Sequence, residues 1–114
     1  MTPRDRDALG DILHAMERAR GFPIPDQAAL LTTDYLQDAL IRCLEVIGEA
    51  SKRLSNELRS QHPQVPWRSM AGMRDLLIHA YDTVDLEEIW EAYLLLPALI
   101  EEISKILRDA PLKP

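Results

Sequence analysis

Hydrophobic residues recur every three or four positions along most of this chain, which is the spacing of amphipathic helices. The first series begins after Thr2 and Pro3, which suit the cap and the first turn of a helix, and Gly21 ends it. Its apolar face consists of Leu9, Ile12, Leu13, Met16 and Ala19. The charged run Asp5-Arg6-Asp7 in its first turn is expected to form a solvent-exposed face.

A longer series occupies residues 33–60, with Thr33 or Thr32 as its cap, and it predicts the longest helix of the chain. Its apolar stripe consists of Leu36, Leu40, Cys43, Ile47, Ala50, Leu54 and Leu58. The stripe is wide enough to serve a core and a dimer contact at once. Gly48 interrupts it, and because glycine inside a helix costs about 1 kcal/mol, we expect another helix to approach closely there.

Three further elements complete the helical pattern. A short helical turn is expected at residues 26–31, and another helix should begin near Trp67 and end near His79. Asp85 caps a last helix, in which Pro97 should cause a kink. The pattern predicts an all-α fold, an antiparallel bundle of four to five helices.

The chain has 114 residues and is expected to form one domain, spanning residues 1–114. Its single cysteine, Cys43, lies in the apolar stripe, so we expect a small buried hydrophobe and a protein suited to the reducing cytoplasm. The start of the chain lacks the pattern of a signal peptide, and no apolar run predicts a membrane span. A net charge of −6 argues against a general nucleic-acid-binding protein. If RNA is the substrate, a few arginines must bind it locally, and the acidic surface suits a basic protein partner.

Candidate chemistry is concentrated in the pattern Arg-x4-His-x-Tyr, formed by Arg74, His79 and Tyr81. Arginine can bind a phosphate with two parallel hydrogen bonds, and histidine transfers protons near neutral pH. The tyrosine hydroxyl can donate to a phosphate oxygen or be modified itself. These three residues therefore suggest a site that cleaves phosphodiesters. Of the other histidines, His14 is expected to be a surface or half-buried residue and His62 a helix-end residue.

The spacing of this motif raises a geometric problem. At 100° per residue, positions 74 and 81 lie on nearly the same face of a helix, whereas position 79 lies about 140° from position 74. A straight helix would therefore not direct Arg74 and His79 at one phosphate. Either the helix breaks after Ile78, or the arginine of one chain serves the histidine of another.

The motif resembles the Arg-x4–6-His motif of the HEPN superfamily, and with Tyr81 it resembles the HepT-like toxins of MNT–HepT toxin–antitoxin modules, which are type VII-like. The flanking residues 44–50, 66–73 and 84–90 are similar as well, so the resemblance extends from about residue 36 to about residue 103. It implies a HEPN-like bundle that forms a symmetric homodimer. The motifs of its two subunits would meet in one cleft.

The resemblance also implies a function. Such proteins are metal-independent endoribonucleases that need no cofactor, with Arg74 and His79 as the matching catalytic residues here. Tyr81 would position the phosphate and accept AMP from a minimal nucleotidyltransferase antitoxin, which would neutralise the toxin. Asp75 matches the polar residue that often follows the motif arginine. Glu49 is either a solvated surface charge or a supporting carboxylate that reaches a motif arginine across the dimer interface.

One alternative from another class stays open. Without the similar flanks, an Arg-His-Tyr cluster at a helix end would more often be structural than catalytic. The chain could then be a non-catalytic helical dimer that serves only as the binding partner of a nucleotidyltransferase. Growth arrest on expression that is lost with His79→Ala would separate the two hypotheses.

Overall fold

The computed structural model of the chain describes residues 1–79 and 85–110, and for Met73 and residues 75–79 it describes the backbone alone. These residues form helices and no β-strand, which confirms the all-α class. The described residues form six helices where four to five were expected: α1 (Pro3–Arg20), α2 (Gln27–Thr32), α3 (Asp34–Lys52), α4 (Asn56–Gln61), α5 (Trp67–His79) and α6 (Leu86–Asp109).

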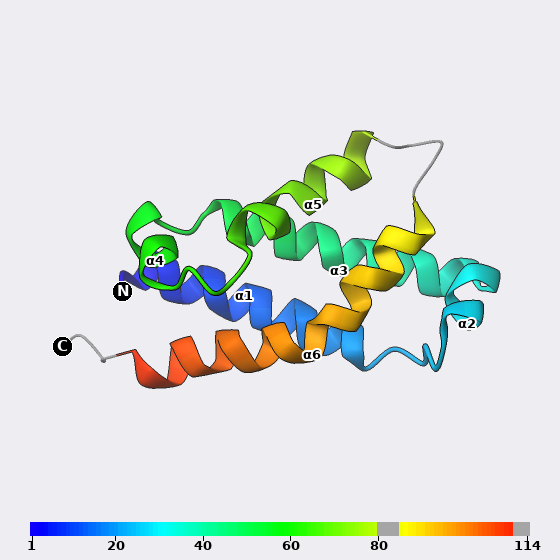
Figure 1. Cartoon of the computed structure of the whole chain (residues 1–114), viewed down its shortest axis with the longest axis horizontal. Helices are drawn as coiled ribbons and strands as arrows, with labels where there is room; N and C mark the ends of the chain where they lie inside the picture. The colour runs from blue at the N-terminus through cyan, green and yellow to red at the C-terminus, as the bar shows by residue number, and fades with distance from the viewer. Residues whose placement is uncertain (80–84, 111–114) are drawn as a thin grey trace.

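Helix α3 is the element against which the others are arranged. It packs extensively against both α1 and α5, and α6 packs mainly against α1. Figure 1 shows α1, α3 and α6 along the long axis of an elongated molecule of 49 × 27 × 20 Å, with α5 crossing over α3. Neighbouring long helices run antiparallel, as the pattern predicted.

The core is made by the apolar faces that the helical spacing predicted. Side chains from four helices are almost wholly inaccessible to solvent: Leu9, Ile12 and Met16 of α1, Leu40, Leu44 and Ile47 of α3, Met70 of α5, and Leu96 and Ile103 of α6. Cys43 is a buried free thiol, and burial raises the pKa of that thiol. The prediction that it behaves as a small buried hydrophobe is confirmed.

The predicted helix over residues 33–60 is broken, and this correction accounts for one of the additional helices. Helix α3 ends at Lys52, and Ser55 caps α4 by accepting a hydrogen bond from the N–H of Leu58 at 3.1 Å. The N–H and hydroxyl of Ser55 donate to the carboxylate of Asp5, at 2.8 and 2.7 Å. An uninterrupted helix would need that N–H for its own ladder, so the bond to Asp5 competes with helix continuation. The longest helix is consequently α6, with 24 residues, and not α3, with 19.

Asp5 is buried, which contradicts the solvent-exposed face expected for this charged run. Its side chain is only 2% exposed. Burial raises the pKa of this carboxyl, but hydrogen bonds from Ser55 and Thr2 outweigh it, so the pKa lies below its ordinary value. A buried charge with full hydrogen bonding thus joins the start of α1 to the start of α4.

The remaining elements follow the sequence pattern. The short helix expected at residues 26–31 is α2, and Asp85 caps α6 by accepting from the N–H groups of Glu87 and Glu88. Pro97 lies inside α6, and Figure 1 shows this helix changing direction about half-way along. Proline cannot donate the backbone bond of a regular helix, which explains the bend. In the described part of the chain, no helix is long and apolar enough to cross a membrane.

We expect Asp5→Asn to lower the free energy of unfolding by about 2 kcal/mol at neutral pH, because an amide cannot accept both hydrogen bonds from Ser55. Urea unfolding measures this loss. Asp7→Asn, in the same turn but exposed, is the matched control and should leave stability nearly unchanged.

This loss should depend on pH. Because the pKa of Asp5 in the folded protein lies below its ordinary value of 3.8, its stabilisation is present above that value and disappears as the pH falls through the lower folded-state pKa. The difference between wild type and Asp5→Asn should therefore shrink in acid. A difference that stays constant would show that the charge of Asp5 is not what stabilises the fold.

Candidate functional site

Arg74 lies where the backbone of α5 comes close to that of α3, and Gly48 makes that approach feasible. A Cβ atom placed on Gly48 would lie 2.8 Å from the Cβ of Arg74, 2.9 Å from its backbone nitrogen and 3.2 Å from the carbonyl oxygen of Met70. Two of these distances are shorter than any ordinary carbon contact, and the backbone of α5 cannot yield cheaply. The expected close helix approach at Gly48 is confirmed, and the neighbouring helix is the one that carries the motif.

The next residue of α3, Glu49, forms an ion pair with Arg74. Its Oε2 lies 2.5 Å from the Nε of Arg74, and the two side chains are 57% and 38% exposed. Sequence analysis left Glu49 either solvated or paired across a dimer interface; the structure shows it paired within one chain. Because exposed ion pairs stabilise a fold by about 1 kcal/mol at most, the main effect of this one is to orient the guanidinium.

An open hollow of about 340 Å³ adjoins this ion pair. It is lined by Arg42, Glu45, Val46, Glu49, Ala50, Arg53 and Arg74. Arg42 pairs with Glu45 at 3.7 Å, and Arg53 pairs with Asp11 at 2.6 Å. Each arginine of this hollow therefore has a carboxylate partner, and an anion could bind there by replacing a carboxylate.

Arg42 and Arg53 did not emerge from the sequence analysis as site residues, although the sequence held a signal for them. Residues 42, 45 and 49 recur at helical spacing on the polar side of α3, opposite its buried stripe, and residue 53 continues that spacing just after the helix ends. Charged residues on a helix are usually solvated, so this spacing alone did not distinguish them. These charged residues become candidate site residues only because Arg74 of the neighbouring helix lies beside them in the folded chain.

His79 is the last residue of α5, so the helix does not break after Ile78. The first of the two geometric alternatives is thereby removed. In a helix that continues to residue 79, positions 74 and 79 lie about 140° apart around the axis. The side chains of His79 and Asp75 are not described, and Tyr81 lies outside the described residues, so their predicted roles stay predictions.

The other histidines have the structural positions expected of them. His14 is exposed on α1, and His62 follows the end of α4. The carbonyl oxygen of His62 accepts a hydrogen bond from the indole N–H of Trp67 at 2.9 Å. Within the described residues, no group of three or more His, Cys, Asp or Glu side chains could hold a metal ion.

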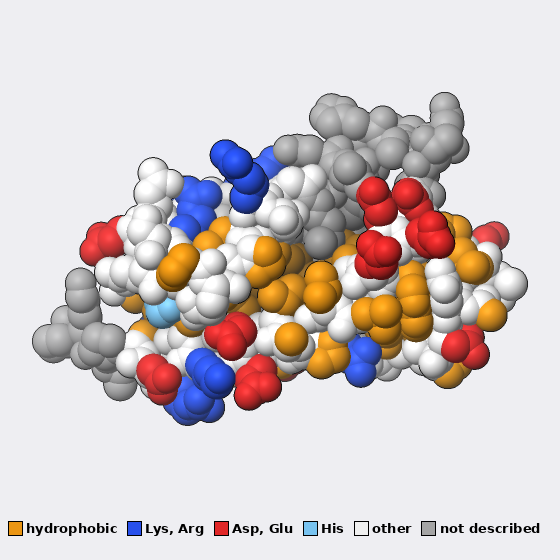
Figure 2. Space-filling view, viewed as in Figure 1, with side chains coloured by type: hydrophobic (Ala, Val, Ile, Leu, Met, Phe, Trp, Pro, Cys, Tyr) orange, Lys and Arg blue, Asp and Glu red, His pale blue; other side chains and the backbone are white. Residues whose placement is uncertain are grey.

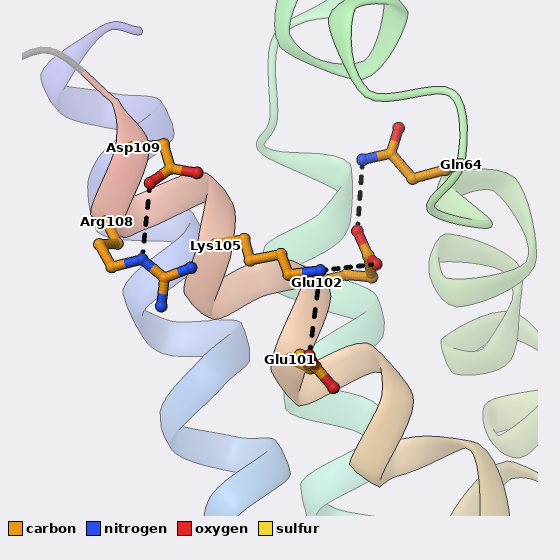
Figure 3. A network of polar contacts seen from close by, with 6 residues as sticks. All are labelled: Gln64, Glu101, Glu102, Lys105, Arg108 and Asp109. Carbon is orange, nitrogen blue, oxygen red and sulfur yellow. Dashed lines mark hydrogen bonds and ion pairs between the residues drawn. The ribbon is translucent and has the colours of Figure 1, made fainter.

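A second polar network lies near the C-terminal end of α6 and joins that helix to the loop before α5 (Figure 3). The ammonium group of Lys105 lies 3.9 Å from both Glu101 and Glu102, and the amide of Gln64 donates to Glu102 at 3.4 Å. Glu101 is exposed, whereas Glu102 is half-buried. These long surface contacts suit a structural role.

We expect Gly48→Ala to lower the free energy of unfolding by about 1–3 kcal/mol, because the added methyl group would push α5 away from α3. Thermal or urea unfolding measures this change. Gly72→Ala on α5 is the matched control: a Cβ there meets nothing within 4 Å, so it should stabilise the helix by up to about 1 kcal/mol. A Gly48→Ala variant as stable as the wild type would show that the two helices are not held at this distance.

Comparisons with known proteins agree with the resemblance seen in the sequence. The family described as "Ribonuclease HepT-like" matches residues 12–106. "Putative RNase MJ0125" of Methanocaldococcus jannaschii is 40% identical over 112 residues, which cover 96% of this chain and 97% of the relative. "Probable ribonuclease HepT" of Thermococcus cleftensis is 44% identical over 91 residues, which cover 75% of this chain and 79% of the relative.

A third relative, "Putative RNase TTE0752" of Caldanaerobacter subterraneus, is 42% identical over 94 residues, covering 82% of this chain and 81% of the relative. No solved structure matches the chain. The family match includes α3, α5 and most of α6, and so the ion pair between Glu49 and Arg74 as well as the motif. The chain therefore belongs to the HepT-like ribonuclease family.

Proposed function

We propose that this protein is a metal-independent endoribonuclease and the toxin of a toxin–antitoxin pair. The observation that supports this most directly is the guanidinium of Arg74, oriented by Glu49 beside an open hollow. It belongs to an Arg-x4-His-x-Tyr motif in a chain of the HepT-like ribonuclease family. Relatives that cover nearly the whole chain carry the name of an RNase.

In the proposed reaction, a ribose 2′-OH attacks the adjacent phosphorus, and the 5′-oxygen leaves. His79 accepts or delivers a proton, and Arg74 stabilises the negative charge that develops on the equatorial phosphate oxygens. The products are a 2′,3′-cyclic phosphate and a 5′-hydroxyl. Phosphate binding would exchange one anionic partner of Arg74 for another, because the exposed pair with Glu49 is weak enough to be displaced.

We further propose a symmetric homodimer in which Arg74 of one subunit acts with His79 of the other. Positions 74 and 79 belong to one continuous helix and lie on different faces of it. A two-fold axis would bring the two motifs together and supply each cleft with both residues. The apolar stripe over residues 36–58, from which a dimer contact was also expected, adds no support, because its residues are all buried within the single chain.

Mixing two inactive variants tests this composite site. Arg74→Ala and His79→Ala homodimers should each fail to cleave RNA. If the two residues act across the interface, a mixed dimer keeps one intact site, so mixing after subunit exchange should restore about a quarter of wild-type cleavage. Sedimentation should show a dimer at micromolar concentration. No recovery in a mixed dimer would place both residues of a site in one chain.

We propose that a minimal nucleotidyltransferase antitoxin silences the enzyme by transferring AMP to Tyr81. Tyr81 belongs to the same motif, two residues after His79 and seven after Arg74, so it is expected near the same phosphate. The added phosphate would pair with Arg74, and the nucleoside would fill space that RNA needs. The modification would thus abolish cleavage by local charge and packing without unfolding the protein.

Tyr81→Phe should escape this silencing, because it lacks the acceptor oxygen. When it is expressed with the cognate transferase, its intact mass should show no added AMP, and growth should stay arrested if Arg74 and His79 perform the chemistry. Wild type treated in the same way should gain AMP and permit growth. AMP on another residue of the variant, or silencing without any added mass, would rule out Tyr81 as the switch. A wild type that neither cleaves RNA nor arrests growth would favour the non-catalytic binding partner.

A further inference from the structure

A second open hollow, of about 470 Å³, lies between α4 and the start of α5. It is lined by Asn56, Arg59, Ser60, Trp67, Arg68 and Ala71. Two of these residues are arginines, and none is a carboxylate. Figure 2 shows Lys and Arg side chains near the start of α5, and a cluster of Asp and Glu side chains over the first part of α6; some Asp and Glu side chains also lie at the end of the molecule that carries α4.

The absence of a carboxylate from this lining is notable in a protein of this composition. The chain has 13 Lys and Arg residues against 19 Asp and Glu residues, and in the hollow beside Arg74 each arginine has a carboxylate partner. Two guanidinium groups that share a hollow without such a partner repel each other, and an anion between them would relieve that repulsion. The neutral side chains of Ser60 and Asn56 offer additional hydrogen-bond donors.

The two arginines differ in how they are held. Arg59 is half-buried; its Nε donates to the carbonyl oxygen of Ser55 at 3.4 Å, and its Nη2 donates to the side chain of Asn56. Arg68 is exposed, and it makes no ion pair or side-chain hydrogen bond with the described part of the chain. One guanidinium is thus fixed in place, and the other is available to close on a ligand.

Helix α5 connects this hollow with the motif. Arg68 precedes His79 by eleven residues of one helix, which corresponds to about 16 Å along the axis and only about 20° around it. The two positions therefore share a face of α5. An RNA strand that follows this face from the cleaved bond would reach the hollow at least two nucleotides away.

We propose that the Arg59–Arg68 hollow binds a backbone phosphate of the RNA substrate, remote from the phosphate that is cleaved. This inference rests on the proposed ribonuclease function. The two arginines would bind and position the strand, and they take no part in the bond-breaking step. A local pair of arginines attracts the RNA backbone, although the protein as a whole carries a net charge of −6.

The test compares Arg68→Gln with wild type on two substrates, a single-stranded oligoribonucleotide and a dinucleotide. The dinucleotide has only the scissile phosphate, so the variant should cleave it normally. With the oligonucleotide, KM should rise several-fold while kcat stays unchanged. The plot of log affinity against log salt concentration, which slopes downward, should become less steep by about 0.7. Arg59→Gln should have the same effect, and its melting temperature must be checked because the Arg59 side chain also donates to the carbonyl oxygen of Ser55 at the start of its own helix.

Arg108→Gln is the matched control, because Arg108 is an exposed arginine on α6, away from both hollows. It should change neither KM nor the salt slope. An equal effect of Arg68→Gln on both substrates, or no effect on either, would overturn the proposal. So would inorganic phosphate binding as tightly as the oligonucleotide, since the hollow would then be a simple anion site.

Failure of the ribonuclease function itself has a different signature. Wild type would then cleave neither substrate, while the anisotropy of a labelled oligonucleotide would still report whether His79→Ala binds RNA. Weaker binding when Arg68→Gln is added to His79→Ala would support the phosphate site independently of cleavage. Equal RNA binding by His79→Ala and by the double variant would overturn the proposed phosphate site.

Discussion

The contact between Gly48 and the backbone of Arg74 is the constraint on which the rest of the site depends. Because no Cβ fits between α3 and α5 at this point, the two helices lie at a distance that only glycine permits. That distance brings Glu49 within ion-pair reach of Arg74. A slightly wider separation would take Glu49 out of ion-pair reach of Arg74. The orientation of the motif arginine is therefore a consequence of backbone packing.

This packing requires the chain to reverse direction after α3, and the buried carboxylate of Asp5 supports that reversal. By accepting hydrogen bonds from the N–H and hydroxyl of Ser55, Asp5 stabilises the break between α3 and α4. The chain then turns through α4 and the following loop and returns along α3 as α5 (Figure 1). A contact between residues fifty positions apart thus stabilises the turn that brings the motif helix back to α3.

The two hollows differ in how their charges are arranged, and therefore in how each could bind a phosphate. Around Arg74, arginines and carboxylates alternate and nearly cancel, so an incoming phosphate exchanges with a partner already present. Between α4 and α5, the described residues that line the hollow include Arg59 and Arg68 and no carboxylate, so a phosphate adds to an existing positive potential. An acidic protein can in this way bind an anionic strand at a few points without attracting nucleic acid over its whole surface.

The sequence by itself determined the helical class, the apolar stripes and most helix ends, because these follow from local spacing and from caps such as Thr2 and Asp85. It also identified Arg74 within its motif and indicated a close approach at Gly48. Only the tertiary structure decided that α3 stops before Ser55, that Asp5 is buried, and that Glu49 pairs with Arg74 in the same chain. Each of these depends on a residue far away in the sequence, and local periodicity carries no information about such a partner. The pairing of Arg59 with Arg68 in one hollow could likewise not be predicted from the sequence, because a hollow between two helices exists only once the helices have packed.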